Sequence, residues 1–151
     1  MHTQLLRLVF VCTLCAAVVT TAANAASFTT SDDPPELKAA RAAIEAKNYD
    51  AALAQLKGIS VKNQSADVYS LMGFALRKTG DRAQSMTYYR KALDADPTHR
   101  GALEYQGELY VELGQIDKAK ENLAKLEKIC WFGCEEQGDL KEAIAHAPKA
   151  K

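Results

Sequence analysis

The chain has 151 residues, of which 48% are hydrophobic and 25% are charged, and this composition fits one globular domain better than a disordered or fibrous chain. Its 19 basic residues equal its 19 acidic residues, so no net field draws the chain towards nucleic acid or an acidic membrane. Only eight glycines and four prolines interrupt a chain rich in helix-forming residues, which predicts an all-α domain.

The first 25 residues, "MHTQLLRLVFVCTLCAAVVTTAANA", have the pattern of an export signal. Arg7 precedes an apolar run over 8–19, and the small residues that follow end in Ala23-Asn24-Ala25, a pattern that signal peptidase accepts. An apolar run of this length is shorter than the about 20 residues that a membrane-spanning helix needs. The pattern predicts a signal peptide over 1–25.

We expect cleavage between Ala25 and Ala26, followed by a short flexible segment over 26–32. The expected destination is the periplasm, with no stable membrane span after cleavage. An uncleaved anchor running over 5–26 is the alternative.

Two helices are expected in the segment 33–65. Asp33, followed by two prolines and a glutamate, is typical of the start of a helix. Lys47 and the Asn-Tyr-Asp that follows it form the turn, and a second helix comes after that turn. Ala40 is the small residue at the centre of the first helix.

Two stretches that begin 34 residues apart then share one pattern: "YSLMGFALRKTGDRAQSMTYYRKALDADP" from Tyr69 and "LEYQGELYVELGQIDKAKENLAKLEKICW" from Leu103. In each stretch a large residue stands four positions before a central glycine, Gly73 or Gly107, and another stands three positions after it. A second glycine closes the first half. This spacing predicts a helix, a turn and a second helix that packs closely over the central glycine.

A period of 34 residues made of helix, turn and helix resembles the tetratricopeptide repeat family. The middle stretch carries the signature positions of that family: Tyr69, Gly73, Leu76, Gly80, Asp81, Tyr89, Ala92 and Pro97. The resemblance implies an α-α superhelix of three units, 33–65, 66–99 and 100–131, within a domain spanning 33–147. A cysteine loop and a capping helix would occupy 132–147, and 148–151 would be a tail.

Local signals suggest where the helices begin. Ser65 should cap the third helix, Asp81 the fourth and Thr98 the fifth. Asp139 with Glu142 predicts the start of a seventh helix that ends at about residue 147, before a proline.

The stretch "KICWFGCEEQGD" contains Cys130 and Cys134, which are the two cysteines left after signal cleavage. Attachment of c-type haem would need C-x-x-C-H, and a thioredoxin-like pair would need C-x-x-C at a helix N-terminus. A metal site would need further ligands, for which His146 and three nearby carboxylates are the candidates: Glu135, Glu136 and Asp139.

The fourth interpretation is a structural disulfide, which we favour. An i, i+4 pair at a helix end brings its Cα atoms to about 6 Å, and this separation suits a disulfide. Gly133 gives the backbone freedom to turn there. Trp131 or Phe132 would then cover the exposed end of the stack.

Catalytic signals are absent from the sequence. It has no nucleophile elbow, zinc-protease or phosphate-loop motif, and we expect neither catalysis nor a cofactor nor a bound metal. The histidines His99 and His146 are expected to be solvated residues in a turn and at a helix end.

Binding is the function that remains, because the first helices of stacked pairs line a concave surface. The surface is expected to be basic in its middle and acidic beyond, with Phe74 as an apolar anchor. The candidate residues are Leu37, Arg41, Ile44, Glu45, Asp67, Ser70, Phe74, Arg77, Lys78, Glu104, Glu108, Val111 and Glu112.

We therefore expect a non-catalytic scaffold or adaptor of a cell-envelope assembly, which binds a protein or peptide and does not bind nucleic acid. Self-association through Trp131 and Phe132 is a further possibility. The alternative function is that of a thiol-redox or metal-handling accessory protein centred on Cys130 and Cys134.

Overall fold

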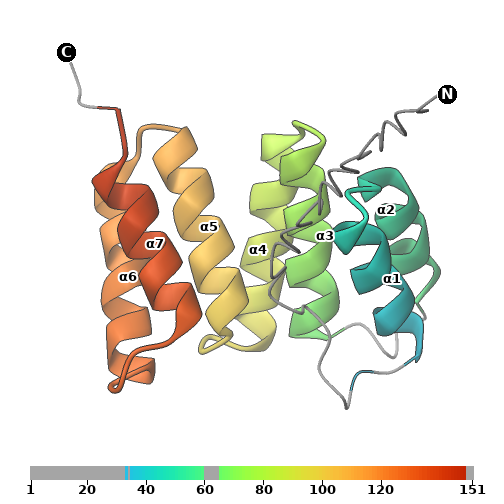
Figure 1. Cartoon of the computed structure of the whole chain (residues 1–151), viewed down its shortest axis with the longest axis horizontal. Helices are drawn as coiled ribbons and strands as arrows, with labels where there is room; N and C mark the ends of the chain where they lie inside the picture. The colour runs from blue at the N-terminus through green and yellow to red at the C-terminus, as the bar shows by residue number, and fades with distance from the viewer. Residues whose placement is uncertain (1–32, 34, 60–64, 149–151) are drawn as a thin grey trace, which may run out of the picture.

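The computed structural model describes residues 33, 35–59 and 65–148, and within these ranges the regular structure consists of helices (Figure 1). The helices are α1 (Pro35–Glu45), α2 (Tyr49–Gly58), α3 (Ala66–Lys78), α4 (Arg82–Ala95), α5 (Arg100–Glu112), α6 (Ile116–Ile129) and α7 (Glu135–Ala145). The predicted all-α class and the seven helices are confirmed. The expected signal peptide, its cleavage site at Ala25 and Ala26, and the segment 26–32 lie outside the described residues.

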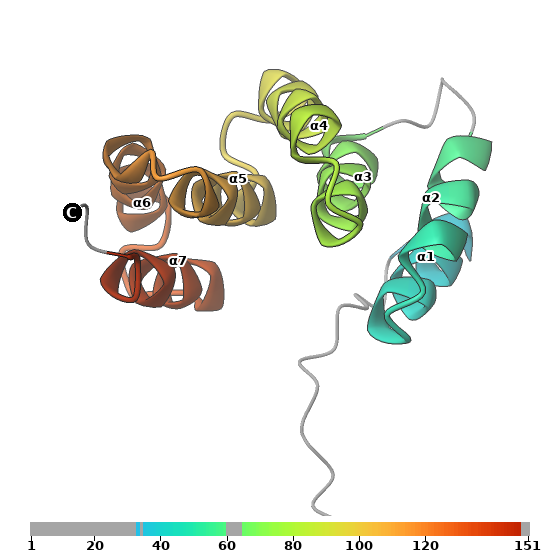
Figure 2. The same cartoon turned by 90° about the horizontal axis from the view of Figure 1, so that it is seen from above.

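The helices form an α-α superhelix of pairs that lie side by side (Figure 1). Viewed from above, α1, α3, α5 and α7 lie along the inner side of an arc, while α2, α4 and α6 lie along its outer side (Figure 2). Each inner helix packs on the outer helix that follows it, and α7 packs on both α5 and α6. The expected solenoid with a capping helix is therefore what the structure shows.

Two of the expected caps start their helices. The Ser65 hydroxyl accepts a hydrogen bond from the backbone N–H of Val68, and the Asp81 carboxylate accepts one from that of Gln84, at 3.0 Å. These bonds satisfy N–H groups that have no partner within the helix.

The third expected cap is wrong. Thr98 donates hydrogen bonds from its backbone N–H and its hydroxyl to the Asp96 carboxylate. The residue that caps α5 is His99, whose Nδ1 accepts a hydrogen bond from the backbone N–H of Ala102 at 3.0 Å. The short Asp96–Thr98 turn uses the threonine hydroxyl, so the next residue becomes the cap.

The turns between the paired helices need left-handed backbone. Gly80 closes α3 with φ of 94°, as the sequence predicted. The same role in the first pair falls to Lys47, with φ of 57°, which is a conformation that a side chain tolerates less well than glycine does. The repeat therefore keeps its turn geometry where the glycine is missing.

The central glycine of the middle pair allows close helix packing. A Cβ atom on Gly73 would lie 2.6 Å from the Tyr89 ring of α4, and the Ser85 hydroxyl donates to the Gly73 carbonyl at 2.7 Å. The expectation that the second helix of the pair lies over this glycine is met.

The equivalent glycine of the last pair, Gly107, meets a different helix. The atoms nearest to a Cβ on Gly107 would belong to the Leu140 side chain of α7, at 2.6 Å. The second helix of this pair, α6, is joined to α5 by Asn122, which donates hydrogen bonds to the Leu103 carbonyl and to Gln106, both at 3.0 Å. The apolar contact over Gly107 is made by the capping helix.

The capping helix begins earlier than the expected Asp139, because α7 starts at Glu135, directly after Cys134. Leu140 is fully buried and joins Leu103, Ala119 and Leu126 in the core at this end of the stack. We expected Trp131 or Phe132 to cover that end, and this expectation is wrong. The two rings contact each other and are 79% and 85% exposed. The tight turn between the cysteines points both rings outward.

Candidate functional site

The inner side of the arc holds a cleft of about 660 Å³. Its walls come from α1, α3 and α5, from the turn before α5, and from the first turns of α7. These are the helices that Figure 2 shows along the inner side. The cleft therefore spans all three helix pairs and the capping helix.

The structure brings eight of the thirteen candidate residues together in the walls of this cleft. They are Arg41, Asp67, Ser70, Phe74, Arg77, Lys78, Glu104 and Glu108. Basic side chains come from α1 and α3 and acidic ones mainly from α5, which follows the polarity that the sequence suggested.

The other five candidates lie elsewhere. The expected exposure of Leu37 and Ile44 is wrong: each is 4% exposed and belongs to the main core, because the face of α1 that carries them packs on the neighbouring helices. The exposure expected of four residues that do line the cleft is wrong as well, since these side chains are buried: Ser70, Phe74, Arg77 and Glu104. Glu45 is exposed outside the cleft lining, Val111 is half-buried against the second core cluster, and Glu112 lies beyond the cleft in an ion pair.

Several residues of the cleft were missed in the sequence. The turn before α5 and the first two residues of α5 add residues 96 and 98–101, and α3, α5 and α6 add Leu71, Tyr105 and Ile129. The first turns of α7 add Glu135, Glu136 and Asp139, which the sequence suggested only as metal ligands. Their place in the cleft follows from the start of α7 at Glu135, which is earlier than the capping pattern predicted.

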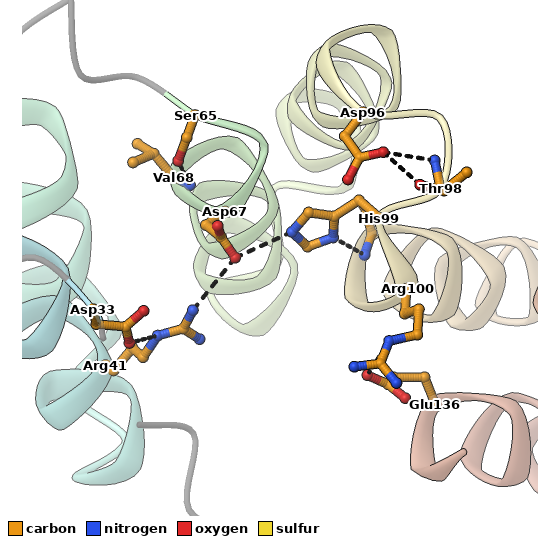
Figure 3. Close-up of polar contacts among 11 residues, drawn as sticks. Asp33, Arg41, Ser65, Asp67, Val68, Asp96, Thr98, His99, Arg100 and Glu136 are labelled. Atoms are coloured by element: carbon orange, nitrogen blue, oxygen red, sulfur yellow. Dashed lines mark hydrogen bonds and ion pairs between the residues drawn. The ribbon is translucent and has the colours of Figure 1, made fainter. Parts of the chain in front are cut away.

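A polar chain joins the three helix pairs at one rim of the cleft (Figure 3). Arg41 of α1 pairs with Asp33 at 2.6 Å and with Asp67 of α3 at 3.5 Å, and Asp67 in turn lies 3.2 Å from Nε2 of His99. Since Nδ1 of His99 accepts from the Ala102 N–H, Nε2 carries the proton and donates it to Asp67. This hydrogen bond, helped by the charge of Arg41, holds the pKa of Asp67 below its ordinary value.

The middle of the cleft is aromatic and basic. Phe74 lies with its ring centroid 4.8 Å from that of Tyr105 and 6.3 Å from that of Tyr49, so an aromatic row crosses from α2 to α5. The ammonium of Lys78 lies 5.1 Å from the centre of the Phe74 ring, within the range of a cation–π contact.

Arg77 is buried at the base of the same region and is tied to α5. It makes ion pairs with Glu108 and, at 3.2 Å, with Glu112, which also pairs with Arg82 at 3.1 Å. The positive charge of Arg77 is therefore neutralised within the protein, and the ion pairs fix α3 against α5.

Glu104 lies at the acidic end of the cleft and is 7% exposed. It makes no hydrogen bond and no ion pair with any residue that the structure describes. Burial, together with the nearby carboxylates of Glu108, Asp139 and Glu136, raises the pKa of Glu104 to about 9, although the charge of Arg77 acts in the opposite direction. At neutral pH this carboxyl group holds its proton.

Cys130 and Cys134 form a disulfide in the structure, with Cα atoms 5.6 Å apart. Cys130 ends α6 and Cys134 precedes the first residue of α7, so the bridge fixes the turn that returns the chain to the stack. Among the residues that the structure describes, no group of three or more histidine, cysteine or acidic side chains is placed to hold a metal ion. Within the same ranges no helix is both long and apolar enough to cross a membrane.

Paired helices stacked into an arc with a cleft along the inner helices define the class of helical-repeat solenoids. Residues 66–99 match a sequence profile described as "Tetratricopeptide repeat", and residues 102–129 match a second profile with the same description. These two segments of the chain are therefore tetratricopeptide repeats. The first match coincides with the unit that the sequence predicted at 66–99.

A curated relative is similar to part of the chain. It is "Cellulose synthase 2 operon protein C" of Komagataeibacter xylinus, and it is 33% identical over 88 residues. These residues make up 58% of the present chain and 7% of the relative. The similarity therefore concerns a small repeat-containing part of a much longer protein.

Proposed function

We propose that this protein binds a segment of another protein in the cleft on its concave side, without catalysing a reaction. The observation that carries the proposal is the cleft itself, whose walls combine the rings of Phe74 and Tyr105 with charged side chains from all three helix pairs. Tetratricopeptide repeats generally serve as modules for interaction with proteins. The volume of the cleft lies in the range that holds a few side chains of a bound segment.

The charges of the cleft give the proposed segment a direction. Lys78 and Arg41 lie towards α1 and α3, whereas Glu135, Glu136 and Asp139 lie at the α7 end. A partner with acidic side chains at one end and basic ones at the other would match this polarity. Such complementarity sets register and specificity more than raw affinity.

The proposed place of action is the periplasm, as a scaffold or adaptor of a cell-envelope assembly. The signal-like pattern over 1–25 and the cysteine pair Cys130–Cys134, which would be oxidised in that compartment, support this part of the proposal. The name of the relative from Komagataeibacter xylinus refers to a cellulose synthase operon. The proposal does not extend to cellulose synthesis, because the match covers 7% of that relative.

Affinity capture from an envelope extract tests the proposal. The cleft variants are Lys78→Glu and Asp139→Lys, because both side chains are exposed and lie in the cleft walls. The matched controls, Lys125→Glu and Glu121→Lys, make the same charge changes at exposed positions of α6 outside the cleft. We expect the cleft variants to lose a partner that the wild type and both controls retain. Equal recovery by all five proteins would refute binding in the cleft.

One observation favours the alternative, a thiol-redox accessory function. Cys134 stands at the N-terminus of α7, where the helix dipole would stabilise a thiolate once the bridge is reduced. A redox centre would cycle between dithiol and disulfide while the fold persists, whereas a structural bridge would lower the unfolding temperature on reduction. Counting accessible thiols before and after mild reduction, with thermal unfolding of both forms, separates the two functions.

A further inference from the structure

We propose that the acidic end of the cleft, around Glu104, is a subsite for one basic side chain, the ammonium of a lysine or the guanidinium of an arginine, of the bound segment. This inference rests on the proposed function and names the chemistry that one part of the cleft recognises. Its basis is a buried carboxyl group that lines the cleft and makes no hydrogen bond or ion pair with any described residue.

The protein does not satisfy this carboxyl group itself. Carboxylates held away from bulk water in proteins are normally paired with a cation or a hydrogen-bond donor. The guanidinium that acts on Glu104, that of Arg77, is already paired with Glu108 and Glu112. Glu104 therefore has no cation of its own, and a ligand could supply one.

The surroundings of Glu104 are acidic on the two helices that form this end. Glu108 lies one turn further along α5, and Glu135, Glu136 and Asp139 come from the first turns of α7. Of these, Glu136 pairs with Arg100 at 3.5 Å (Figure 3), while Glu135 and Asp139 have no ion-pair partner among the described residues. Three carboxyl groups at one end of the cleft are thus left without a cation.

A side chain fits this place better than a metal ion does. The described carboxylates do not come together as a group that could hold a metal. A lysine or arginine has a long apolar stem that can lie along Tyr105 and Ile129, which also line the cleft, while its head reaches the carboxyl groups. The same cation would favour the ionised form of Glu104, so binding should release its proton.

Nuclear magnetic resonance titration with short probe peptides tests the inference. The probes are blocked peptides of the form acetyl-Ala-Ala-Xaa-Ala-Ala-amide, in which Xaa is lysine, arginine, norleucine or ε-acetyl-lysine. We expect saturable shifts of the backbone amides of Glu104 and of the first turn of α7 with at least one of the two basic peptides, and none with the two neutral ones. Absence of such shifts with both basic peptides, or equal shifts with the neutral peptides, would overturn the subsite.

Two variants that each replace one glutamate by glutamine sharpen the test. Glu104→Gln should weaken binding of the basic peptide by about tenfold or more, whereas Glu127→Gln, at an exposed position of α6 outside the cleft, should leave it unchanged. Equal affinities of the two variants would refute the role of Glu104. For the wild type, affinity should rise between pH 6 and pH 8, because ionisation of Glu104 becomes easier, and this rise should disappear in Glu104→Gln. The charged groups that act on Glu104 are Glu108 of its own helix, Arg77 of α3 and Glu136 and Asp139 of α7.

Further titrations separate other sources of a cation. Free n-butylammonium should bind about tenfold or more weakly than the lysine peptide, because it lacks contacts along the cleft. Equal or tighter binding of butylammonium, or of Mg²⁺ or Ca²⁺ at the same amides, would overturn the assignment to a side chain. If capture of a partner depends on Lys78 but the affinity of the basic peptides is the same for the wild type and Glu104→Gln, this inference fails and the proposed function stands. If the charge reversals in the cleft leave capture unchanged, the proposed function fails.

Discussion

The buried carboxyl group of Glu104 should make the stability of the fold fall as pH rises, and Glu104→Gln should remove this dependence. In the folded state the pKa of Glu104 is raised to about 9, whereas in the unfolded chain it is near 4.5. As pH rises, Glu104 therefore loses its proton in the unfolded state before it does so in the folded state. Between these two values the folded state binds more protons than the unfolded state, so increasing pH favours unfolding. Below pH 4.5 both states are protonated and the dependence ends.

The magnitude follows from the proton linkage. Each pH unit within this window changes the free energy of unfolding by up to about 1.4 kcal/mol, so the wild type should lose about 3 kcal/mol relative to Glu104→Gln between pH 5 and pH 7. Urea unfolding followed by circular dichroism at pH 5, 6, 7 and 8 measures the difference. Other groups, such as Asp67 with its lowered pKa, act equally in both proteins and cancel.

Glu127→Gln provides the control, because it removes a carboxylate from an exposed position. Its stability should follow that of the wild type within about 0.5 kcal/mol at every pH. If the curves of the wild type and Glu104→Gln run parallel from pH 5 to pH 8, then Glu104 is ionised or solvated in the folded protein, and the reasoning about the acidic end of the cleft is wrong.

Three further predictions concern the capping helix and its loop. Gly107→Ala should lower the free energy of unfolding, measured by urea unfolding, by about 1–3 kcal/mol, because the new Cβ would lie 2.6 Å from Leu140. Gly138→Ala should raise the free energy of unfolding by about 0.5–1 kcal/mol in the same experiment, because open space surrounds its Cβ. Reducing the disulfide should cost about 2 kcal/mol, measured by thermal unfolding with and without reductant, and an unchanged unfolding temperature would contradict a structural role. Replacing Trp131 and Phe132 by serine should change the free energy of unfolding by less than about 0.5 kcal/mol, because both rings are exposed. Sedimentation at increasing concentration tests self-association through these rings, which would appear in the wild type and be lost in the variant.

The architecture could be predicted because its signals are short-range and repeated. The small and large positions of the middle unit, such as Gly73 and Tyr89, recur 34 residues later, as stacked helix pairs require. In the structure Gly73 and the Tyr89 ring pack directly against each other. The caps at Ser65 and Asp81 are equally local, since each bond spans three residues. A competing local bond is enough to defeat such a prediction, as Thr98 shows by binding Asp96.

The capping helix illustrates why the rest of the site was missed. The residue pair Asp139 and Glu142 resembles a helix start, but the chain reverses earlier, where Gly133 takes a positive φ between the two cysteines. Glu104 of α5 lies near Glu136 and Asp139 of α7, and the packing of α7 on α5 is a contact between segments distant in sequence. A carboxylate on an inner helix therefore looked like an exposed charge until the packing of α7 was known.

The same docking gives α7 two roles that depend on each other. Leu140 fills the space over Gly107 and closes the apolar stack, and this contact places the first turn of α7, with Glu136, at the end of the cleft. The disulfide fixes the start of that turn through Cys134. On our proposal, a change that loosens α7 should therefore weaken recognition of a basic side chain before it unfolds the solenoid, because the acidic end of the cleft depends on α7 whereas the aromatic row from Tyr49 through Phe74 to Tyr105 does not.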